Sequence, residues 1–202
     1  MKNICISGIH TDAGKSHVSA ALCYAFGYEY FKLIQAGALT DESFVKKTAP
    51  HVISHAPGIM LQTPASPHVG MIKENVKFDG LSIKIPKDEN VLTELAGGLF
   101  CPLDENAYMI DFMAKSGLPT FLVARNYLGS INHTVLSIEA LKARNIEILG
   151  VIFSQIRDEM SQSFLQNKYK DLNFFVLEDF DLGFEKVANN LKEQILRSGV
   201  KL

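Results

Sequence analysis

Residues 3–16 read NICISGIHTDAGKS, an apolar run followed by a glycine-rich loop and the start of a helical pattern. The run at 3–7 favours a buried strand, and the spacing of apolar residues at 15–26 favours a helix. A glycine-rich loop that ends in Gly-Lys-Ser between a strand and a helix is typical of a phosphate-binding P-loop. Five residues separate Gly8 from Gly14, one more than in the strict motif. The stretch nevertheless predicts that the chain binds phosphate groups.

Each residue type in this loop suits contact with phosphate. Backbone N–H groups at a helix N-terminus point outward and attract anions. Gly14 lets the backbone come close, Lys15 reaches the outer phosphates, and the hydroxyl of Ser16 can bind Mg²⁺. We therefore expect a nucleotide to contact the second half of the loop and the first turn of the helix, at Asp12, Ala13, Gly14, Lys15, Ser16 and His17.

The same alternation of short apolar runs and helical patterns continues along the chain. Further strands are expected at 28–36, 90–94, 119–125, 147–153 and 172–177, and helices from 41 onward and at 106–116, 130–144, 158–170 and 183–197. Residues 81–95 leave no room for a long helix, so a hairpin or short loop is expected there. The pattern predicts an α/β fold of the P-loop class. Its mostly parallel central sheet has helices on both faces, in a single domain spanning residues 1–202.

Composition excludes several other classes of protein. The net charge of −2 argues against a nucleic-acid partner, and no apolar run approaches the length that spans a membrane. The first strand begins at the N-terminus and does not resemble a signal peptide. Three scattered cysteines without a C-x-x-C motif fit a reducing compartment, so we expect a cytoplasmic protein.

Several motifs after the loop resemble, in order and spacing, those of the dethiobiotin synthases. They are Lys32 in FKLIQAG, Asp41 in TDES, residues 66–68 (Ser-Pro-His), Glu94 in TELAGG, and residues 129–133 (GSINH). The matches extend from residue 1 to about residue 135. The resemblance implies a ligase that uses 7,8-diaminopelargonate, CO2 and ATP. A carbamate forms on one amine, ATP activates it as a mixed anhydride, and the second amine closes the ureido ring of dethiobiotin.

The resemblance also implies roles for individual residues. Lys15, Lys32 and Thr11 would be catalytic, with Lys32 beside the negatively charged carbamate. The apolar neighbours of Lys32 place it on a buried strand, where a lysine requires a partner. Ser16, Asp41 and Glu94 would hold Mg²⁺, which prefers such hard oxygen ligands. Asp41 also suits the first turn of a helix, and the two roles are compatible.

The substrate would lie between two subunits of a homodimer. The resemblance assigns one part of the substrate site to Thr11, Lys32, Ala36 and Gly97, and the rest to the partner subunit's copy of Gly129, Ser130, Ile131 and Asn132, which would hold the carboxylate tail. On the residues alone, the 129–133 segment is read equally well as a helix cap. Ala36 stands where a hydroxyl residue is common, so one substrate contact is lost.

Base recognition is where the sequence departs most from the pattern. Ser154 and Gln155 replace the Asn-Asp pair expected after the strand at 147–153, and one hydroxyl cannot make the paired hydrogen bonds that identify adenine. We therefore expect weak discrimination among nucleoside triphosphates, with Ser154 at the nucleotide site. Two other functions stay open: a related partitioning-type ATPase, whose extra loop lysine is replaced by Ile9-His10, and a non-catalytic nucleotide-binding module.

Overall fold

A six-stranded parallel sheet forms the centre of the protein. The computed structural model describes residues 2–38, 40–87, 90–155 and 158–202. The sheet order is β2-β5-β1-β6-β7-β8, and every neighbouring pair is parallel. The strands are β1 (Ile4–Gly8), β2 (Glu29–Lys32), β5 (Val91–Glu94), β6 (Thr120–Ala124), β7 (Ile148–Ser154) and β8 (Phe174–Leu177). The mostly parallel sheet predicted from the sequence is confirmed.

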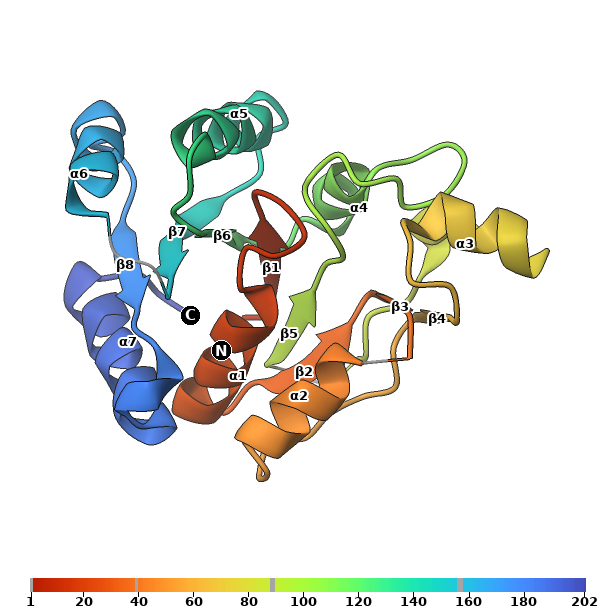
Figure 1. The fold of residues 1–202 in the computed structure, drawn as a ribbon, viewed down its shortest axis with the longest axis horizontal. Helices are drawn as coiled ribbons and strands as arrows, with labels where there is room; N and C mark the ends of the chain where they lie inside the picture. The colour runs from red at the N-terminus through yellow and green to blue at the C-terminus, as the bar shows by residue number, and fades with distance from the viewer. Residues whose placement is uncertain (1, 39, 88–89, 156–157) are drawn as a thin grey trace.

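Helices cover both faces of this sheet. The helices are α1 (Lys15–Phe26), α2 (Asp41–Thr48), α3 (Pro67–Glu74), α4 (Met109–Ser116), α5 (Ser130–Ala143), α6 (Glu159–Lys168) and α7 (Phe184–Ser198), with short 3-10 turns η1 (Gly80–Ser82) and η2 (Phe180–Leu182). Figure 1 shows α1, α2 and α7 on one face and α4, α5 and α6 on the other. Because both faces are covered, β1, β5 and β6 consist of buried residues throughout.

The strand predicted at 28–36 is wrong in its extent. The central sheet keeps only β2, and the chain leaves it at Leu33, whose N–H donates to the Glu94 carbonyl oxygen at 3.0 Å. The remainder forms β3 (Ile34–Ala36), which pairs in parallel with β4 (Ile59–Leu61) in a separate two-stranded sheet. The bend follows from pairing, because β5 ends at Glu94 and offers β2 no further partner. It places the side chain of Lys32 at the edge of the central sheet.

The stretch at 81–95 contains no hairpin in its described residues. Residues 83–87 form a loop after η1, and β5 then begins at Val91. The other predicted helices and strands agree with the structure to within about three residues, the usual uncertainty of element ends. None of the helices in the described ranges is long and apolar enough to cross a membrane.

Candidate functional site

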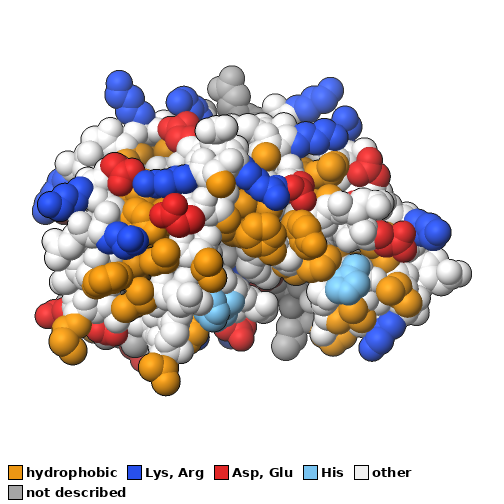
Figure 2. Space-filling view, turned by 90° about the horizontal axis from the view of Figure 1, so that it is seen from above, with side chains coloured by type: hydrophobic (Ala, Val, Ile, Leu, Met, Phe, Trp, Pro, Cys, Tyr) orange, Lys and Arg blue, Asp and Glu red, His pale blue; other side chains and the backbone are white. Residues whose placement is uncertain are grey.

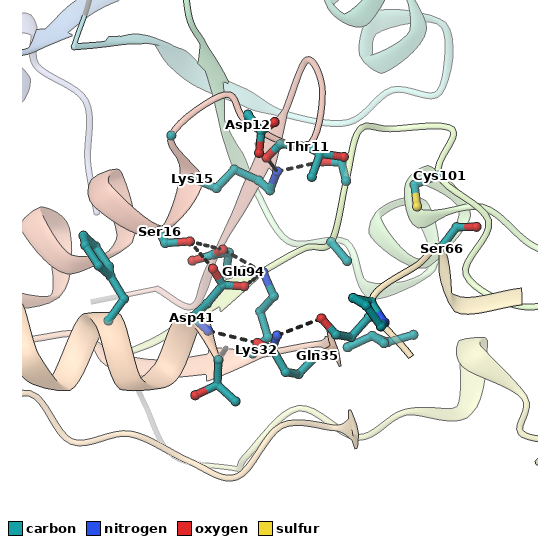
Figure 3. Close-up of a pocket in the computed structure, with 18 of the residues that line it drawn as sticks. Thr11, Asp12, Lys15, Ser16, Lys32, Gln35, Asp41, Ser66, Glu94 and Cys101 are labelled. Carbon is teal, nitrogen blue, oxygen red and sulfur yellow. Dashed lines mark hydrogen bonds and ion pairs between the residues drawn. The ribbon is translucent and has the colours of Figure 1, made fainter. Parts of the chain in front are cut away.

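A cavity of about 770 Å³ opens at the C-terminal edge of the central sheet. The loop after β1, the last residues of β2 and β5, and the start of α2 contribute to its walls. Figure 3 shows their polar side chains converging from these separate segments. The carboxyl ends of parallel strands are where open α/β sheets bind ligands, so the topology itself selects this position.

The glycine loop passes close to the end of β7 where α1 begins. Gly14 adopts a left-handed conformation with φ of 93° and is the N-cap of α1. A Cβ atom at Gly14 would lie 2.2 Å from Oγ of Ser154, so any side chain there would collide as well as strain the backbone. The requirement for glycine inferred from the motif therefore has two causes, backbone conformation and the close approach of β7.

The side chain of Lys15 points back toward the glycine loop. Its Nζ donates to the carbonyl oxygens of His10 and Thr11 at 3.1 Å each and of Gly97 at 2.8 Å. Burial, with a smaller effect from the positive charge of Lys32, lowers the pKa of Lys15 to about 8. The ammonium group thus lies in the cavity among neutral carbonyl groups, free of any carboxylate within hydrogen-bond distance among the residues that the structure describes.

Three side-chain oxygens meet just below this lysine. Oγ of Ser16 lies 2.5 Å from Oδ1 of Asp41 and 3.0 Å from Oε1 of Glu94. Neighbouring oxygen ligands of an octahedral Mg²⁺ stand about 3 Å apart, because each lies about 2.1 Å from the ion. The two carboxylates and the hydroxyl therefore fit the donor set and spacing of a magnesium site, and the structure brings together the three residues predicted for it.

Lys32 is the buried cation of this cluster. Its Nζ lies 2.7 Å from Oδ2 of Asp41 and 2.7 Å from Oε1 of Glu94. Lys32 and Glu94 are direct neighbours in the pairing of β2 with β5, which explains how residues distant in sequence meet. Burial alone would lower the pKa of Lys32, but the charges of Glu94 and Asp41 raise it above its ordinary value. The predicted need of this lysine for a partner is confirmed.

Three residues that sequence reasoning missed hold Glu94 and the backbone of Asp41 in place. Ser19 and Tyr30 donate hydroxyl hydrogen bonds of 2.7 and 3.1 Å to Oε2 of Glu94, which leaves Oε1 facing the cavity. The side-chain oxygen of Gln35 accepts from the backbone N–H of Asp41 at 3.0 Å. Spacing offered a signal for two of them. Ser19 lies one helical turn after Ser16, and Tyr30 lies two residues before Lys32, on the same face of its strand.

The other residues predicted at the nucleotide site are more dispersed. Asp12 is exposed, and its N–H donates to Nδ1 of His10 at 3.0 Å. The backbone turn at Ala13 is buried. The ring of His17 lies half-buried between Phe44 and Phe180, with centroids 4.5 and 5.2 Å apart.

Ser154 lies behind the loop instead of in the cavity. It is fully buried, and its Oγ has no hydrogen-bond partner among the residues that the structure describes. Its neighbour Gln155 lines the cavity and adopts a left-handed conformation with φ of 68°. The involvement of Ser154 with a nucleotide stays a prediction, and its burial is one reason to expect little base recognition from this side chain.

Residues predicted to bind substrate divide into two groups. Thr11, Lys32, Ala36 and Gly97 line the cavity, as does Ser66 at the start of α3. Gly129, Ser130, Ile131 and Asn132 do not line it, although they form the N-terminus of α5 as predicted. The chain therefore leaves its own 129–132 segment outside the cavity that its other predicted site residues share.

An apolar surface adjoins this segment. A smaller cavity of about 370 Å³ lies between the outer side of the glycine loop, residues 97–101 and α5. Figure 2 views the molecule from the side of α4 and α5 and shows hydrophobic side chains gathered in the middle of that face. The large hydrophobic side chains exposed near the glycine loop, residues 97–101 and α5 are Phe100, Tyr108, Tyr127, Leu128 and Leu136, which we call the apolar surface. Exposed patches of this kind typically mark sites of protein association.

Solved structures with very different sequences share this fold. A ParA family ATPase from Chlorobium tepidum TLS superimposes with a TM-score of 0.54 at 12% sequence identity, covering 100% of this chain and 94% of that one. A MinC:MinD cell division protein complex from Aquifex aeolicus gives a TM-score of 0.52 at 12% identity, covering 100% of this chain and 97% of that one. At such low identity the likeness supports the architecture and says nothing about the reaction.

Sequence comparison is far more specific. The profile of an AAA domain family matches residues 2–182. An ATP-dependent dethiobiotin synthetase, BioD of Campylobacter jejuni subsp. jejuni, is 53% identical over 178 residues, which cover 88% of each chain. Another ATP-dependent dethiobiotin synthetase, from Paramagnetospirillum magneticum, is 38% identical over 76% of this chain and 77% of its own. The chain therefore belongs to the ATP-dependent dethiobiotin synthetase family.

Proposed function

We propose that this chain is a cytoplasmic, single-domain, ATP- and Mg²⁺-dependent dethiobiotin synthetase of biotin biosynthesis. It would close the ureido ring of dethiobiotin from 7,8-diaminopelargonate and CO2. One observation carries the proposal. Lys15, Ser16, Lys32, Asp41 and Glu94 converge at one cavity in a chain whose curated relative is 53% identical over 88% of its length. Such convergence supplies the cations and oxygen ligands that phosphoryl transfer requires.

The loop and α1 would bind the triphosphate. The N-terminus of α1 presents its first backbone N–H groups, which have no partner inside the helix, and the positive end of the helix dipole. Lys15 brings a cation that only neutral carbonyl groups contact, so a phosphate oxygen gains a charged partner without breaking an ion pair. This part of the site would position the γ-phosphoryl group and offset its charge, which is most of what a phosphoryl transferase contributes.

Ser16, Asp41 and Glu94 would hold Mg²⁺ beside the phosphates. When bound, the ion neutralises charge on the phosphate oxygens. Ser19 and Tyr30 already fix the orientation of Glu94, so little reorganisation is needed for Oε1 to face the cavity. Before the ion binds, the positive charge of Lys32 offsets the negative charges of Asp41 and Glu94. This lowers the free-energy cost of keeping both carboxylates ionised where they are buried.

Lys32 and Thr11 would contact the substrate. One amine of the diamine adds to CO2 and loses a proton, giving a carbamate whose negative charge Lys32 would offset. A carbamate oxygen then attacks the γ-phosphorus and ADP leaves. The second amine attacks the carbamate carbon, releases phosphate and loses a proton as the ring closes. Each step needs alignment and charge balance more than an additional chemical group, and fixed side chains of the cavity can provide both.

This assignment predicts that phosphate release requires all reaction components together. Purified protein should release phosphate from ATP only when Mg²⁺, bicarbonate and 7,8-diaminopelargonate are all present, and excess chelator should abolish the release. A coupled phosphate assay with each component omitted in turn measures this. Rapid ATP hydrolysis without the diamine would favour a general ATPase and contradict the synthetase assignment.

The site would be completed in a homodimer. We infer that the partner subunit's N-terminus of α5, at Gly129, Ser130, Ile131 and Asn132, binds the carboxylate tail of the substrate through backbone N–H groups and the side-chain amide of Asn132. Two observations support this inference. The segment does not line the cavity of its own chain, and the apolar surface lies next to it. A symmetric dimer would bury that surface and bring each 129–132 segment to the other subunit.

Mixing two inactive variants tests the shared site. Lys15→Ala and Asn132→Ala damage different halves, so each heterodimer would contain one intact site and one doubly defective site. After free subunit exchange, an equal mixture should recover about a quarter of wild-type activity, because half the dimers are heterodimers with one working site of two. Mixing Lys15→Ala with itself is the matched control. A fully active monomer in sedimentation, or no recovery after proven exchange, would contradict the shared site.

A further inference from the structure

Arg125 follows β6 at the same sheet edge as the glycine loop. Val123, two residues earlier, pairs with Gly8, and its carbonyl oxygen accepts the N–H of Ile9 at 3.0 Å. Arg125 is half-buried and lines the large cavity together with Asp12 and Gln155. It therefore lies beside the start of the glycine loop, at the wall of the same cavity.

The side chain of Arg125 differs from those of the other two cavity cations because it has no protein partner among the described residues. Three cations line the cavity, and two of them are already held, Lys15 by three carbonyl oxygens and Lys32 by two carboxylates. Arg125 makes no hydrogen bond or ion pair with any residue that the structure describes, although Asp12 lines the same cavity. A guanidinium group with five donors in a half-buried place is thus left to bind an anion.

The charge of this guanidinium group acts on the start of the loop. Burial is the largest cause that lowers the pKa of His10, and the positive charges of Lys15 and Arg125 add to the lowering. His10 directly precedes the Thr11–Ser16 stretch where the phosphates are expected. The same charge would therefore attract an anion bound at this part of the loop.

We propose that Arg125 binds the phosphate chain of the nucleotide, as a second cation in addition to Lys15. The proposal rests on the nucleotide site of the proposed function. A planar guanidinium group matches paired phosphate oxygens and forms strong charge-assisted hydrogen bonds with them. Base recognition has little support here, since Ser154 is buried behind Gly14. Arg125 would thus help the chain to bind nucleotides mainly by their phosphates, whatever the base.

Calorimetric titration with Mg-ADP, Mg-GDP and Mg-CDP tests this assignment. The wild type should bind all three with affinities within about a hundredfold of one another, because the phosphates are their shared part. Arg125→Gln should weaken all three equally, by about ten- to a hundredfold, the usual effect of losing hydrogen bonds to a charged group. Arg125→Lys keeps the positive charge but loses the paired N–H donors of the guanidinium group. Its nucleotide affinity should therefore lie between those of the wild type and Arg125→Gln. Arg197→Gln is the matched control, since Arg197 is exposed on α7 and pairs with Glu193 on the same helix.

Each possible result bears on the proposal. Arg125→Gln binding all three nucleotides as tightly as the wild type would overturn it, and a loss confined to one nucleotide would overturn it in favour of a contact to the base. A wild type that binds none of the three would count against the nucleotide site itself. Unchanged thermal unfolding confirms that Arg125→Gln is folded. If Arg125→Gln does not fold, the test rests on Arg125→Lys. Wild-type nucleotide affinity in Arg125→Lys, together with an affinity that does not change with salt concentration, would contradict a phosphate contact.

Discussion

Replacing Lys15 by alanine is expected to lower kcat by about a hundred- to a thousandfold, the usual loss when one charged group that faces the transition state is removed. In the part of the chain that the structure describes, this ammonium group donates to three carbonyl oxygens, two of which belong to the loop that would hold the phosphates. Charge on the oxygen that bridges to ADP grows as phosphate transfers, so the missing cation matters more in the transition state than in the bound ground state. The loss should therefore appear mainly in kcat, with a smaller change in KM.

Steady-state kinetics of the complete reaction would measure this effect. Lys46→Ala is the matched control, because Lys46 is exposed on α2 and pairs with Glu42 one turn away. That variant should keep wild-type kcat and KM, since such surface pairs contribute little. A Lys15→Ala enzyme with kcat within tenfold of wild type would contradict the assigned role.

Sequence reasoning grouped residues that share one cavity because they lie at predictable points of an α/β sheet. Lys32 and Glu94 each end an apolar run, and parallel strands bring such ends to one edge. The loop before α1 is recognisable because a buried strand, two glycines and a lysine occur together. The local sequence pattern did not predict which strands are neighbours in the sheet. The placement of β5 between β1 and β2 is what joins Lys32 to Glu94 and Glu94 to Ser16.

Features that depend on tertiary contact were beyond the sequence. The two-stranded sheet of β3 and β4 involves only three residues from each strand, too few to show a periodicity. The hydroxyls of Ser19 and Tyr30 lie among apolar residues, and only the structure shows that Glu94 accepts from both. Likewise, Ser154 ends its strand as expected, but the close approach of Gly14 buries it. Such packing depends on distances between elements, which no local pattern encodes.

Lys32→Gln is expected to abolish ring closure, with turnover reduced at least a hundredfold, while ADP binding stays close to wild type. Glutamine has similar length but no charge, so it cannot offset the carbamate. It should not disturb the nucleotide, because Lys32 contacts the two carboxylates and the Leu95 carbonyl and makes no contact with the glycine loop among the described residues. In this variant, turnover should therefore fall while the affinity for ADP stays close to that of the wild type.

The same variant should also be less stable without metal. Lys32 is the only basic side chain within ion-pair distance of the buried Glu94 carboxylate among the described residues. Removing one partner of a buried ion pair typically costs about 3–5 kcal/mol, since the other charge is left uncompensated. Mg²⁺ bound by Asp41 and Glu94 would replace the lost charge, so thermal unfolding should shift downward in chelator and recover largely with Mg-ADP. Lys46→Gln is the control for both measurements. Near-normal turnover in Lys32→Gln would show that the lysine is structural, and an equal loss of ADP affinity would move its role from the substrate to the nucleotide.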